Sequence, residues 1–185
     1  MERLVFELNL YGEDLAKYED IVSKWLTEAF NSKVSFMSAI NEKHVSNFYN
    51  SFRGQYSAEG LAIYVYSKKV YKDSIAIAIF DLDAYVPELN FVFGLALPPY
   101  KVATVYTFRL RYMANEEKFL ERLKKEVLHE IGHVLGLTHC RNKLCVMSFS
   151  NSIFEVDSKQ AKFCDKCNNK LLSRGIHVSN KYLLK

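Results

Sequence analysis

The sequence predicts an α/β (α+β) fold built on a mixed, mostly parallel twisted sheet with helices packed against it. Residues 74–81 (SIAIAIFD) form a short continuous apolar run, which is typical of a strand buried on both faces. Strand-like and helix-like segments alternate over the first half of the chain, as they do where helices connect parallel strands. The 185 residues are 49% hydrophobic, enough for the core of one domain spanning 1–185.

The other elements follow from their periodicity and end signals. Besides residues 74–81, the expected strands are residues 2–10, 34–40, 89–97 and 102–110. The expected helices are residues 12–30, 58–69 and 115–136. The stretch 41–57 has no clean period. Charges interrupt the apolar run of the N-terminal MERLVFELNLYGED, which therefore predicts a strand rather than a signal peptide.

The helix expected at 115–136 divides the chain. Acidic Glu116 and Glu117 occupy its first turn, where the helix dipole favours them. Gly136 can adopt the left-handed conformation that ends helices. We therefore expect an N-terminal subdomain, 1–136, that ends with this helix. The turn-rich remainder, 137–185, forms a small C-terminal subdomain.

Charge and hydropathy exclude some partners. The 25 basic and 21 acidic residues are interleaved, and the formal net charge is +4, which argues against nucleic acid as a partner. No apolar stretch reaches the roughly 18 residues that a membrane span needs, so we expect no membrane association. These features predict a cytoplasmic protein, whose cysteines are kept reduced.

All four cysteines lie between residues 140 and 167. They are Cys140, Cys145, Cys164 and Cys167, in the spacing C-x4-C-x18-C-x2-C. Two close pairs separated by about 15–20 residues are typical of a closed, tetrahedral structural zinc site. The alternatives are four inert buried cysteines, or two disulfides, which a reducing compartment disfavours.

Three of the five histidines lie in one stretch, HEIGHVLGLTH. His129 and His133 are four residues apart on the expected helix, so their imidazoles project from one face and can bind one zinc ion. Gly136 ends the helix and lets the chain turn back, which brings His139 in as a third ligand. Three protein ligands leave one zinc position open, as catalytic sites require. Chance produces the extended pattern in roughly one sequence in 10⁵, whereas HExxH alone is weak. The alternative interpretation is that the three histidines are core residues that bind no metal.

Glu130 completes a hydrolytic site. It lies about 100° around the helix from His129, so it can reach a water on the metal without being a ligand. Zinc lowers the pKa of that water and polarises a scissile carbonyl, and Glu130 acts as the general base. The stretch thus predicts a zinc-dependent hydrolase of peptide bonds, with peptide or protein substrates.

The motif resembles that of a known family. His129–His139 is similar to the elongated zinc motif of the metzincin metallopeptidases. Cys140 follows at once, Cys145 and Met147 come in Cys-Val-Met, and Cys164-Asp-Lys-Cys167 closes the set. The string 129–167 resembles the archaemetzincins.

The resemblance implies a metzincin-like catalytic domain with two zinc ions per chain. One is catalytic, at His129, His133 and His139, and the other is structural, at the four cysteines. It also implies that Met147 supports the metal from below, although the residue by itself predicts only a core position. Residues 90–96 would line the cleft, where a peptide adds as a further strand. Many metzincins carry a tyrosine just after the methionine; here Ser148-Phe149 follows.

Two alternatives accompany this interpretation. A nucleic-acid-associated zinc module, or a DNA-repair-type protease with a four-cysteine structural zinc, would also combine such motifs. Asp81, Asp83 and Glu88 follow a strand and could bind a hard cation, although carboxylates in a turn after a strand are much commoner without one.

Overall fold

Five strands form the main sheet, in the order β2-β1-β5-β8-β7, in the computed structural model, which describes residues 3–185. They are β1 (Val5–Tyr11), β2 (Lys33–Met37), β5 (Ile75–Phe80), β7 (Gly94–Leu97) and β8 (Val102–Tyr106). The first four in this order pair in parallel, and β7 pairs with β8 antiparallel at one edge. The predicted mixed, mostly parallel sheet is therefore confirmed.

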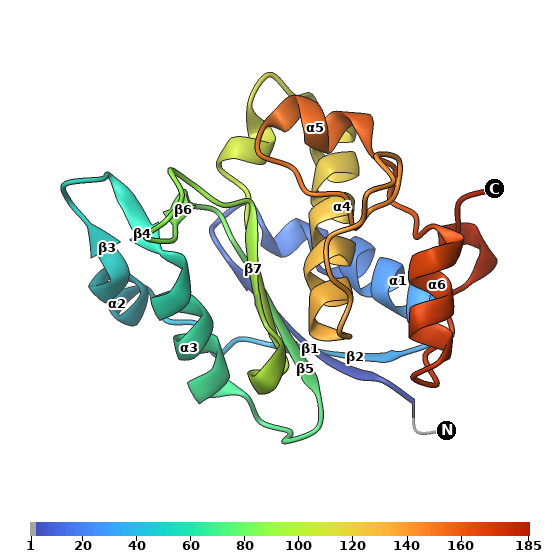
Figure 1. The fold of residues 1–185 in the computed structure, drawn as a ribbon. Coiled ribbons are helices and arrows are strands. Elements are labelled where there is room, and N and C mark those ends of the chain that lie inside the picture. Colours follow the sequence, from blue (N-terminus) through green and yellow to red (C-terminus); the bar gives the residue numbers. More distant parts are fainter. Residues whose placement is uncertain (1–2) are drawn as a thin grey trace.

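Three helices cover the two faces of this sheet (Figure 1). They are α1 (Glu19–Phe30), α3 (Ala58–Lys68) and α4 (Glu116–Val134). In β5, Ile75, Ile77 and Ile79 belong to the core formed with α1 and α4. The intervening Ala76, Ala78 and Phe80 belong to a second core, formed with α3. Burial on both faces explains why the strand carries no polar alternation.

A smaller sheet, β3-β4-β6, extends the molecule beyond α3 (Figure 1). Its strands are β3 (Tyr49–Asn50), β4 (Gln55–Ser57) and β6 (Ala84–Tyr85), and the short helix α2 (Glu42–Val45) lies beside it in sequence. Residues 41–57, which show no clean period, thus fold into several very short elements. Elements of two to four residues cannot display a period.

Three predicted strands are too long, and the one expected at 34–40 ends at Met37. The strand expected at 89–97 begins only at Gly94. Arg53 and Gln55 donate side-chain hydrogen bonds to the carbonyls of Leu89 and Asn90, and the Val92 N–H donates to Ala84 of the smaller sheet. The side chains and the smaller sheet therefore provide hydrogen-bond partners for the backbone of Leu89, Asn90 and Val92, which lies outside the ladder between β7 and β8.

The strand expected at 102–110 ends at Tyr106, and residues Arg109–Arg111 form a 3₁₀ turn. In this turn Arg109 forms an ion pair with Asp83, with Nε 2.7 Å from Oδ1. Arg111 forms one with Asp81, with Nε 3.2 Å from Oδ1. The aspartates suggested as a cation site are therefore paired with arginines. Among residues 3–185 they belong to no group of three or more potential metal ligands.

The first predicted helix also begins later than expected. Residues 12–15 form a turn, with the Leu15 N–H donating to the Gly12 carbonyl, and a 3₁₀ turn at Ala16–Tyr18 precedes α1. The buried Leu15 side chain holds this turn against the core. The strand predicted at 2–10 is present as β1, and its residue 2 lies outside the described residues.

The C-terminal segment is more ordered than its composition suggests. It contains α5 (Ile153–Ser158) and α6 (Asp165–Leu172), whereas the sequence predicts only a turn-rich segment. The tail after α6 packs on α1: Tyr182 is buried, and its hydroxyl donates to Glu28 Oε2 at 3.0 Å. No helix within residues 3–185 combines the length and the apolar character needed to cross a membrane.

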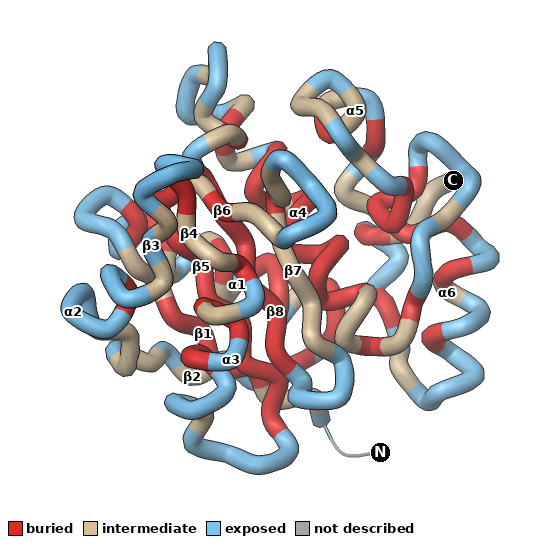
Figure 2. The backbone as a smooth tube through the Cα atoms, turned by 60° about the vertical axis from the view of Figure 1, so that its left-hand side comes forward, coloured by how far each residue is buried: buried red, intermediate tan, exposed pale blue. Residues whose placement is uncertain are grey.

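Burial is concentrated in the central strands and α4, whereas β7 is only partly covered (Figure 2). One buried polar contact ties β1 to the connection between α3 and β5. The Glu7 carboxylate, 1% exposed, accepts hydrogen bonds from the N–H groups of Val70 and Tyr71, at 2.9 and 2.7 Å, and from the Ser74 hydroxyl. The carboxylate therefore accepts the hydrogen bonds that these three donors would otherwise make to water.

We expect Glu7→Ala to lower the free energy of unfolding by about 2–4 kcal/mol, because it leaves these donors without an acceptor. Urea unfolding followed by circular dichroism measures the change. Glu13→Ala, at an exposed acid in the turn before α1, is the matched control and should stay within about 0.5 kcal/mol of the parent. Equal losses in the two variants would contradict the role of Glu7.

Candidate active site

Helix α4 carries the motif and is anchored at both ends. At its start, the Asn115 side chain accepts a hydrogen bond from the Lys118 N–H at 2.9 Å. Phe119, Leu123 and Val127 bury one face against the sheet. The face that carries His129 and Glu130 therefore points into the cavity between the helix and β7.

The three histidines converge. Their ring nitrogens lie within 4.8 Å of one another, and Nε2 of His129 is 3.1 Å from Nε2 of His133. Nδ1 of His129 lies 2.7 Å from the Val146 carbonyl, and Nδ1 of His133 lies 2.9 Å from the Leu137 carbonyl. A carbonyl can only accept, so each Nδ1 carries the proton and each Nε2 presents a lone pair to the common point.

This donor set suits a metal ion. Two lone pairs 3.1 Å apart repel each other unless a cation or a proton lies between them. Burial lowers the pKa of all three histidines, of which His139 is the most exposed. The neutral, metal-binding form of each imidazole is therefore favoured. Three neutral imidazoles are a common ligand set of catalytic zinc.

The turn after α4 brings His139 to the other two histidines. Gly136 adopts φ +89°, a conformation that side-chain-bearing residues rarely take. The Leu137 N–H donates to the Gly132 carbonyl at 2.9 Å and closes the helix. Arg174 Nη1 donates to the Leu135 carbonyl at 2.7 Å and occupies the space where a side chain at Gly136 would begin. Gly136 is thus required for its backbone and for its missing side chain, and only the first reason is visible in the sequence.

Glu130 is 5% exposed and lies against the edge strand. A Cβ atom at Gly94 would stand 2.5 Å from Glu130 Oε1, so the strand can approach the carboxylate only because residue 94 is glycine. Burial raises the pKa of Glu130 well above its ordinary value, and the neighbouring Glu126 adds to the effect, while Lys159 opposes it. A carboxylate that holds a proton more tightly is a better general base.

These groups line one cavity of about 320 Å³. Its wall on one side is the segment from Phe91 to Ala96, which includes most of β7. On the other side are the motif histidines, Glu130, and the loop of Phe149, Ser150 and Asn151. The ring of Phe149 packs edge-on against His139, with centroids 5.0 Å apart.

Met147 lies fully buried against α4. Its Sδ atom occupies the space that a Cβ at Gly132 would need, so the glycine inside HEIGH is what lets the sulfur reach α4. The backbone around Met147 serves the site as well: the Met147 carbonyl accepts from the Cys140 N–H at 2.8 Å.

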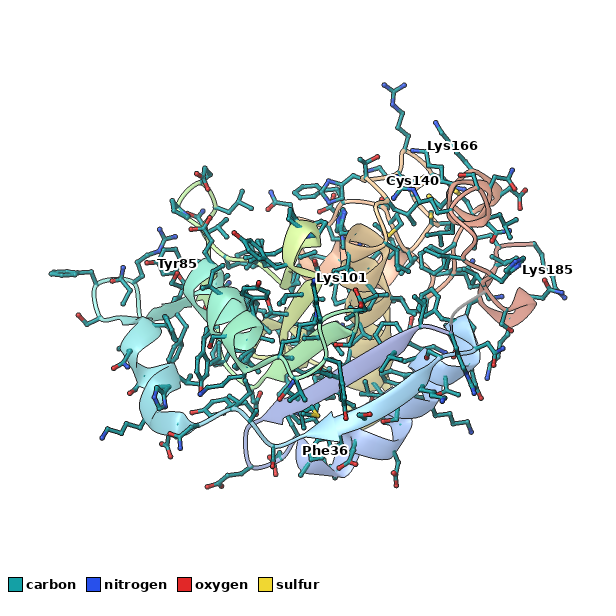
Figure 3. The ribbon with its side chains drawn as sticks, turned by 90° about the horizontal axis from the view of Figure 1, so that it is seen from below. Phe36, Tyr85, Lys101, Cys140, Lys166 and Lys185 are labelled. Atoms are coloured by element: carbon teal, nitrogen blue, oxygen red, sulfur yellow. The ribbon has the colours of Figure 1, made fainter. Side chains whose placement is uncertain are left out.

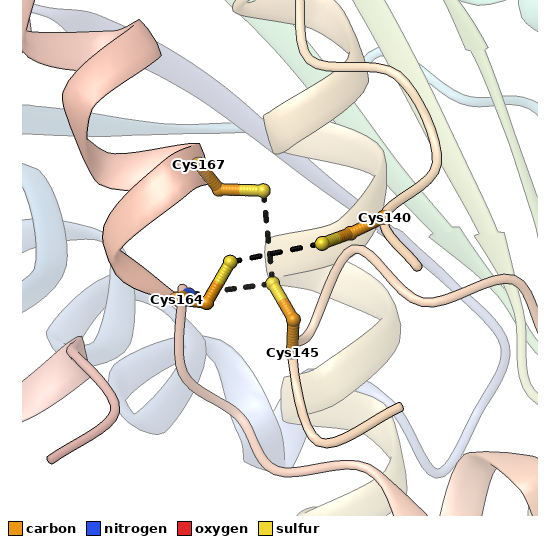
Figure 4. A group of neighbouring side chains, drawn as sticks. All are labelled: Cys140, Cys145, Cys164 and Cys167. Atoms are coloured by element: carbon orange, nitrogen blue, oxygen red, sulfur yellow. Dashed lines mark hydrogen bonds between the residues drawn. The ribbon is translucent and has the colours of Figure 1, made fainter. Parts of the chain in front are cut away.

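The four cysteines converge at a second point, between the loop after α4 and the start of α6 (Figure 4). The Sγ atoms of Cys140 and Cys164 are 3.6 Å apart, and those of Cys145 and Cys167 are 3.7 Å apart. Four sulfurs at the usual zinc distance of about 2.3 Å in a tetrahedron are about 3.8 Å apart, so the spacing fits zinc.

All four cysteines are free thiols. The hydrogen bond between Cys145 and Cys167 lowers the pKa of Cys145 to about 5 and raises that of Cys167, as two thiols competing for one proton do. A thiolate at neutral pH is the form that binds zinc. The cluster lies at the end of the molecule formed by the C-terminal segment, where Figure 3 shows Cys140, whereas Tyr85 of the smaller sheet lies at the opposite end.

Comparison with known proteins agrees with this geometry. The model of Peptidase family M54 matches residues 21–173. The archaemetzincin of Nanoarchaeum equitans is 43% identical over 171 residues, covering 92% of this chain and 94% of that protein. The archaemetzincin of Methanocaldococcus jannaschii is 36% identical, covering 95% and 99%.

Solved structures share the fold. The archaemetzincin of Methanopyrus kandleri superposes with a TM-score of 0.77 at 34% identity, covering 92% of this chain and 94% of that one. A zinc-dependent peptidase of Methanocorpusculum labreanum has a TM-score of 0.74 at 27% identity, covering 90% and 99%. These likenesses support the peptidase rather than a nucleic-acid-binding module. The chain belongs to peptidase family M54, the archaemetzincin family of zinc metallopeptidases.

Proposed function

We propose that this peptidase hydrolyses peptide bonds in the cavity beside β7, with Glu130 as general base. His129, His133 and His139 hold the catalytic zinc, and Cys140, Cys145, Cys164 and Cys167 hold a second, structural zinc. The convergence of three imidazole lone pairs beside one buried carboxylate carries this proposal. The whole chain acts as one domain, in which 137–185 is the subdomain that the second zinc stabilises, and Met147 supports the catalytic centre from below.

Substrate binding follows from the exposed edge of the sheet. β7 pairs with β8 on one side only, so its other edge is free to pair with a peptide. The peptide main chain then lies along residues 93–96, across the opening of the cavity. This arrangement brings a scissile carbonyl beside Glu130 without any requirement for a particular side chain.

Glu130 performs the proton transfers. A bound zinc ion would polarise the scissile carbonyl and acidify the attacking water. Glu130 takes the proton from that water and delivers it to the leaving amine. Its burial, and the glycine contact at residue 94, hold the carboxylate in one place and keep bulk water away from it.

The same loop carries residues of both centres. His139 and Cys140 are adjacent, and the Val146 carbonyl, which orients His129, lies between Cys145 and Met147. Holding the cysteines therefore holds the loop that orients the histidines. Four free thiols also suit a reducing compartment, and we propose that the protein acts in the cytoplasm.

We expect Glu130→Gln to abolish peptide hydrolysis while zinc content stays unchanged, because it removes the base and no metal ligand. Peptide cleavage read by mass spectrometry, together with elemental analysis, measures both quantities. Glu117→Gln, at an exposed acid on the same helix, is the control and should keep full activity. Substantial activity in Glu130→Gln, or loss of zinc from it, would refute the assignment.

Gly94→Ala should lower kcat by about 10- to 100-fold, because its Cβ displaces the Glu130 carboxylate from its position. Zinc content and the far-ultraviolet circular dichroism spectrum should not change. Ser51→Ala, in an exposed turn, serves as the control for rate. An unchanged kcat in Gly94→Ala would show that the carboxylate does not need this close contact.

The two metals should differ in how easily they leave. The histidine centre opens to the cavity through the exposed His139, whereas three of the four cysteines are buried. A chelator should remove one zinc per chain quickly and stop activity while the fold survives. Release of the second should coincide with unfolding of residues 137–185, and Cys164→Ser should lower the melting temperature. Elemental analysis and circular dichroism follow both steps; a zinc content that never exceeds one per chain would refute the two-site proposal.

A further inference from the structure

A second hollow adjoins the catalytic cavity. It has a volume of about 520 Å³, and we call it the aromatic hollow because the rings of Phe91, Phe93, Phe108, Tyr112 and Phe154 line it. Phe91, Phe93 and Asn151 line the catalytic cavity as well. The two spaces therefore share a wall, and a peptide that extends out of the catalytic cavity on this side reaches the aromatic hollow.

The rings around the aromatic hollow are accessible to a ligand. Phe108 and Tyr112, in the turn after β8, are 62% and 60% exposed, and Phe154 in α5 is 76% exposed. Phe93 is buried, and its ring packs edge-on against Phe91 with centroids 5.1 Å apart. A single exposed ring needs no explanation, whereas several around one hollow mark an interaction site.

The two arginines of the aromatic hollow contribute no net charge. Arg109 donates to both carboxylate oxygens of Asp83, at 2.7 and 2.8 Å, and its guanidinium lies 4.1 Å from the ring centroid of Phe91. Arg111 donates to Asp81 at 3.2 Å. Each cation is matched by a carboxylate, so a charged ligand side chain would leave water without gaining a partner. An apolar side chain gains free energy from burial here.

The edge strand determines which part of a substrate reaches the aromatic hollow. Antiparallel pairs are commoner and slightly more stable than parallel ones, so we expect the peptide to run antiparallel to β7. β7 runs from Gly94, where the strand meets Glu130, to Leu97. Substrate residues that follow the scissile bond therefore continue past Gly94 toward Phe91. Because Phe91 is three residues from Gly94, it is reached by the second or third of them.

We propose that the aromatic hollow is a specificity subsite for an aromatic side chain at the second or third substrate residue after the scissile bond. Edge-to-face contacts between rings stabilise such a pair beyond the area that it buries, which favours an aromatic over an aliphatic side chain. The subsite adds binding free energy and holds the peptide against the edge strand. This inference rests on the proposed function, because it places the scissile bond at Glu130.

The test uses the zinc-loaded full chain and peptides that differ at one residue. Phenylalanine, alanine, aspartate or lysine is placed at the second or at the third position after the bond that mass spectrometry shows to be cleaved. We expect kcat/KM to be about 5- to 50-fold higher for phenylalanine than for alanine at one of these positions. Aspartate and lysine should give no gain over alanine, because the hollow offers neither an unpaired positive charge nor an unpaired negative one.

Two variants assign the preference to the aromatic hollow. Phe108→Ala and Phe154→Ala should each reduce the phenylalanine-to-alanine ratio about three- to fivefold. Both side chains are more than half exposed, so their removal leaves the core intact. Phe52→Ala, which removes a fully exposed ring from the turn between β3 and β4, is the matched control and should keep the ratio.

A binding measurement separates this inference from the proposed chemistry. Calorimetry on zinc-loaded Glu130→Gln gives Kd for the phenylalanine and alanine peptides without cleavage. If the phenylalanine peptide binds more tightly but the parent enzyme cleaves neither, the catalytic proposal fails and the subsite stands. Equal kcat/KM and equal Kd for the two peptides would overturn the inference. So would a preference for aspartate or lysine, one found only before the cleaved bond, or a ratio that Phe108→Ala and Phe154→Ala leave unchanged.

Discussion

The contact between His129 Nδ1 and the Val146 carbonyl is the interaction on which both proposed centres depend. It turns the imidazole so that Nε2 faces the other histidines, and it fixes the loop after α4 against the helix. Cys145 and Met147 flank Val146, so the same loop places one thiol of the cysteine cluster and the sulfur that packs against Gly132. Displacing this loop would disturb the two sites together, although their donors differ in kind.

The second constraint on the site is that neighbouring segments must approach α4 and its end closely. The helix is contacted at Gly132 by Met147, at Gly136 by Arg174, and through Glu130 by the edge strand at Gly94. At each contact a side chain or backbone occupies the volume of a missing Cβ. The catalytic face of the helix thus has close neighbours on several sides and borders a cavity of about 320 Å³. Enclosure desolvates the imidazoles, which favours their neutral, metal-binding form, and it raises the pKa of Glu130, which makes the carboxylate a stronger base.

Two ionised groups are buried beside the cavity, and removing them from water costs free energy. Glu126 and Lys159 are buried as an ion pair beside the site, and apolar residues of similar size often stabilise a protein at least as well. Both groups act on Glu130, because Glu126 raises the pKa of its carboxyl group and Lys159 lowers it.

The sequence by itself determined the class of fold, the helix that carries the motif, and both sets of potential ligands. Each of these depends on local spacing: His129 and His133 are four positions apart, and the cysteines come in two close pairs. The tertiary structure alone decided which atoms complete the site. The Val146 carbonyl, Gly94, Arg174 and Lys159 reach it from distant segments, and no local period marks them. The same limit explains the shortened strand at 89–97, because Val92 pairs with Ala84 of the smaller sheet, and local sequence does not say which sheet a strand-like segment will join.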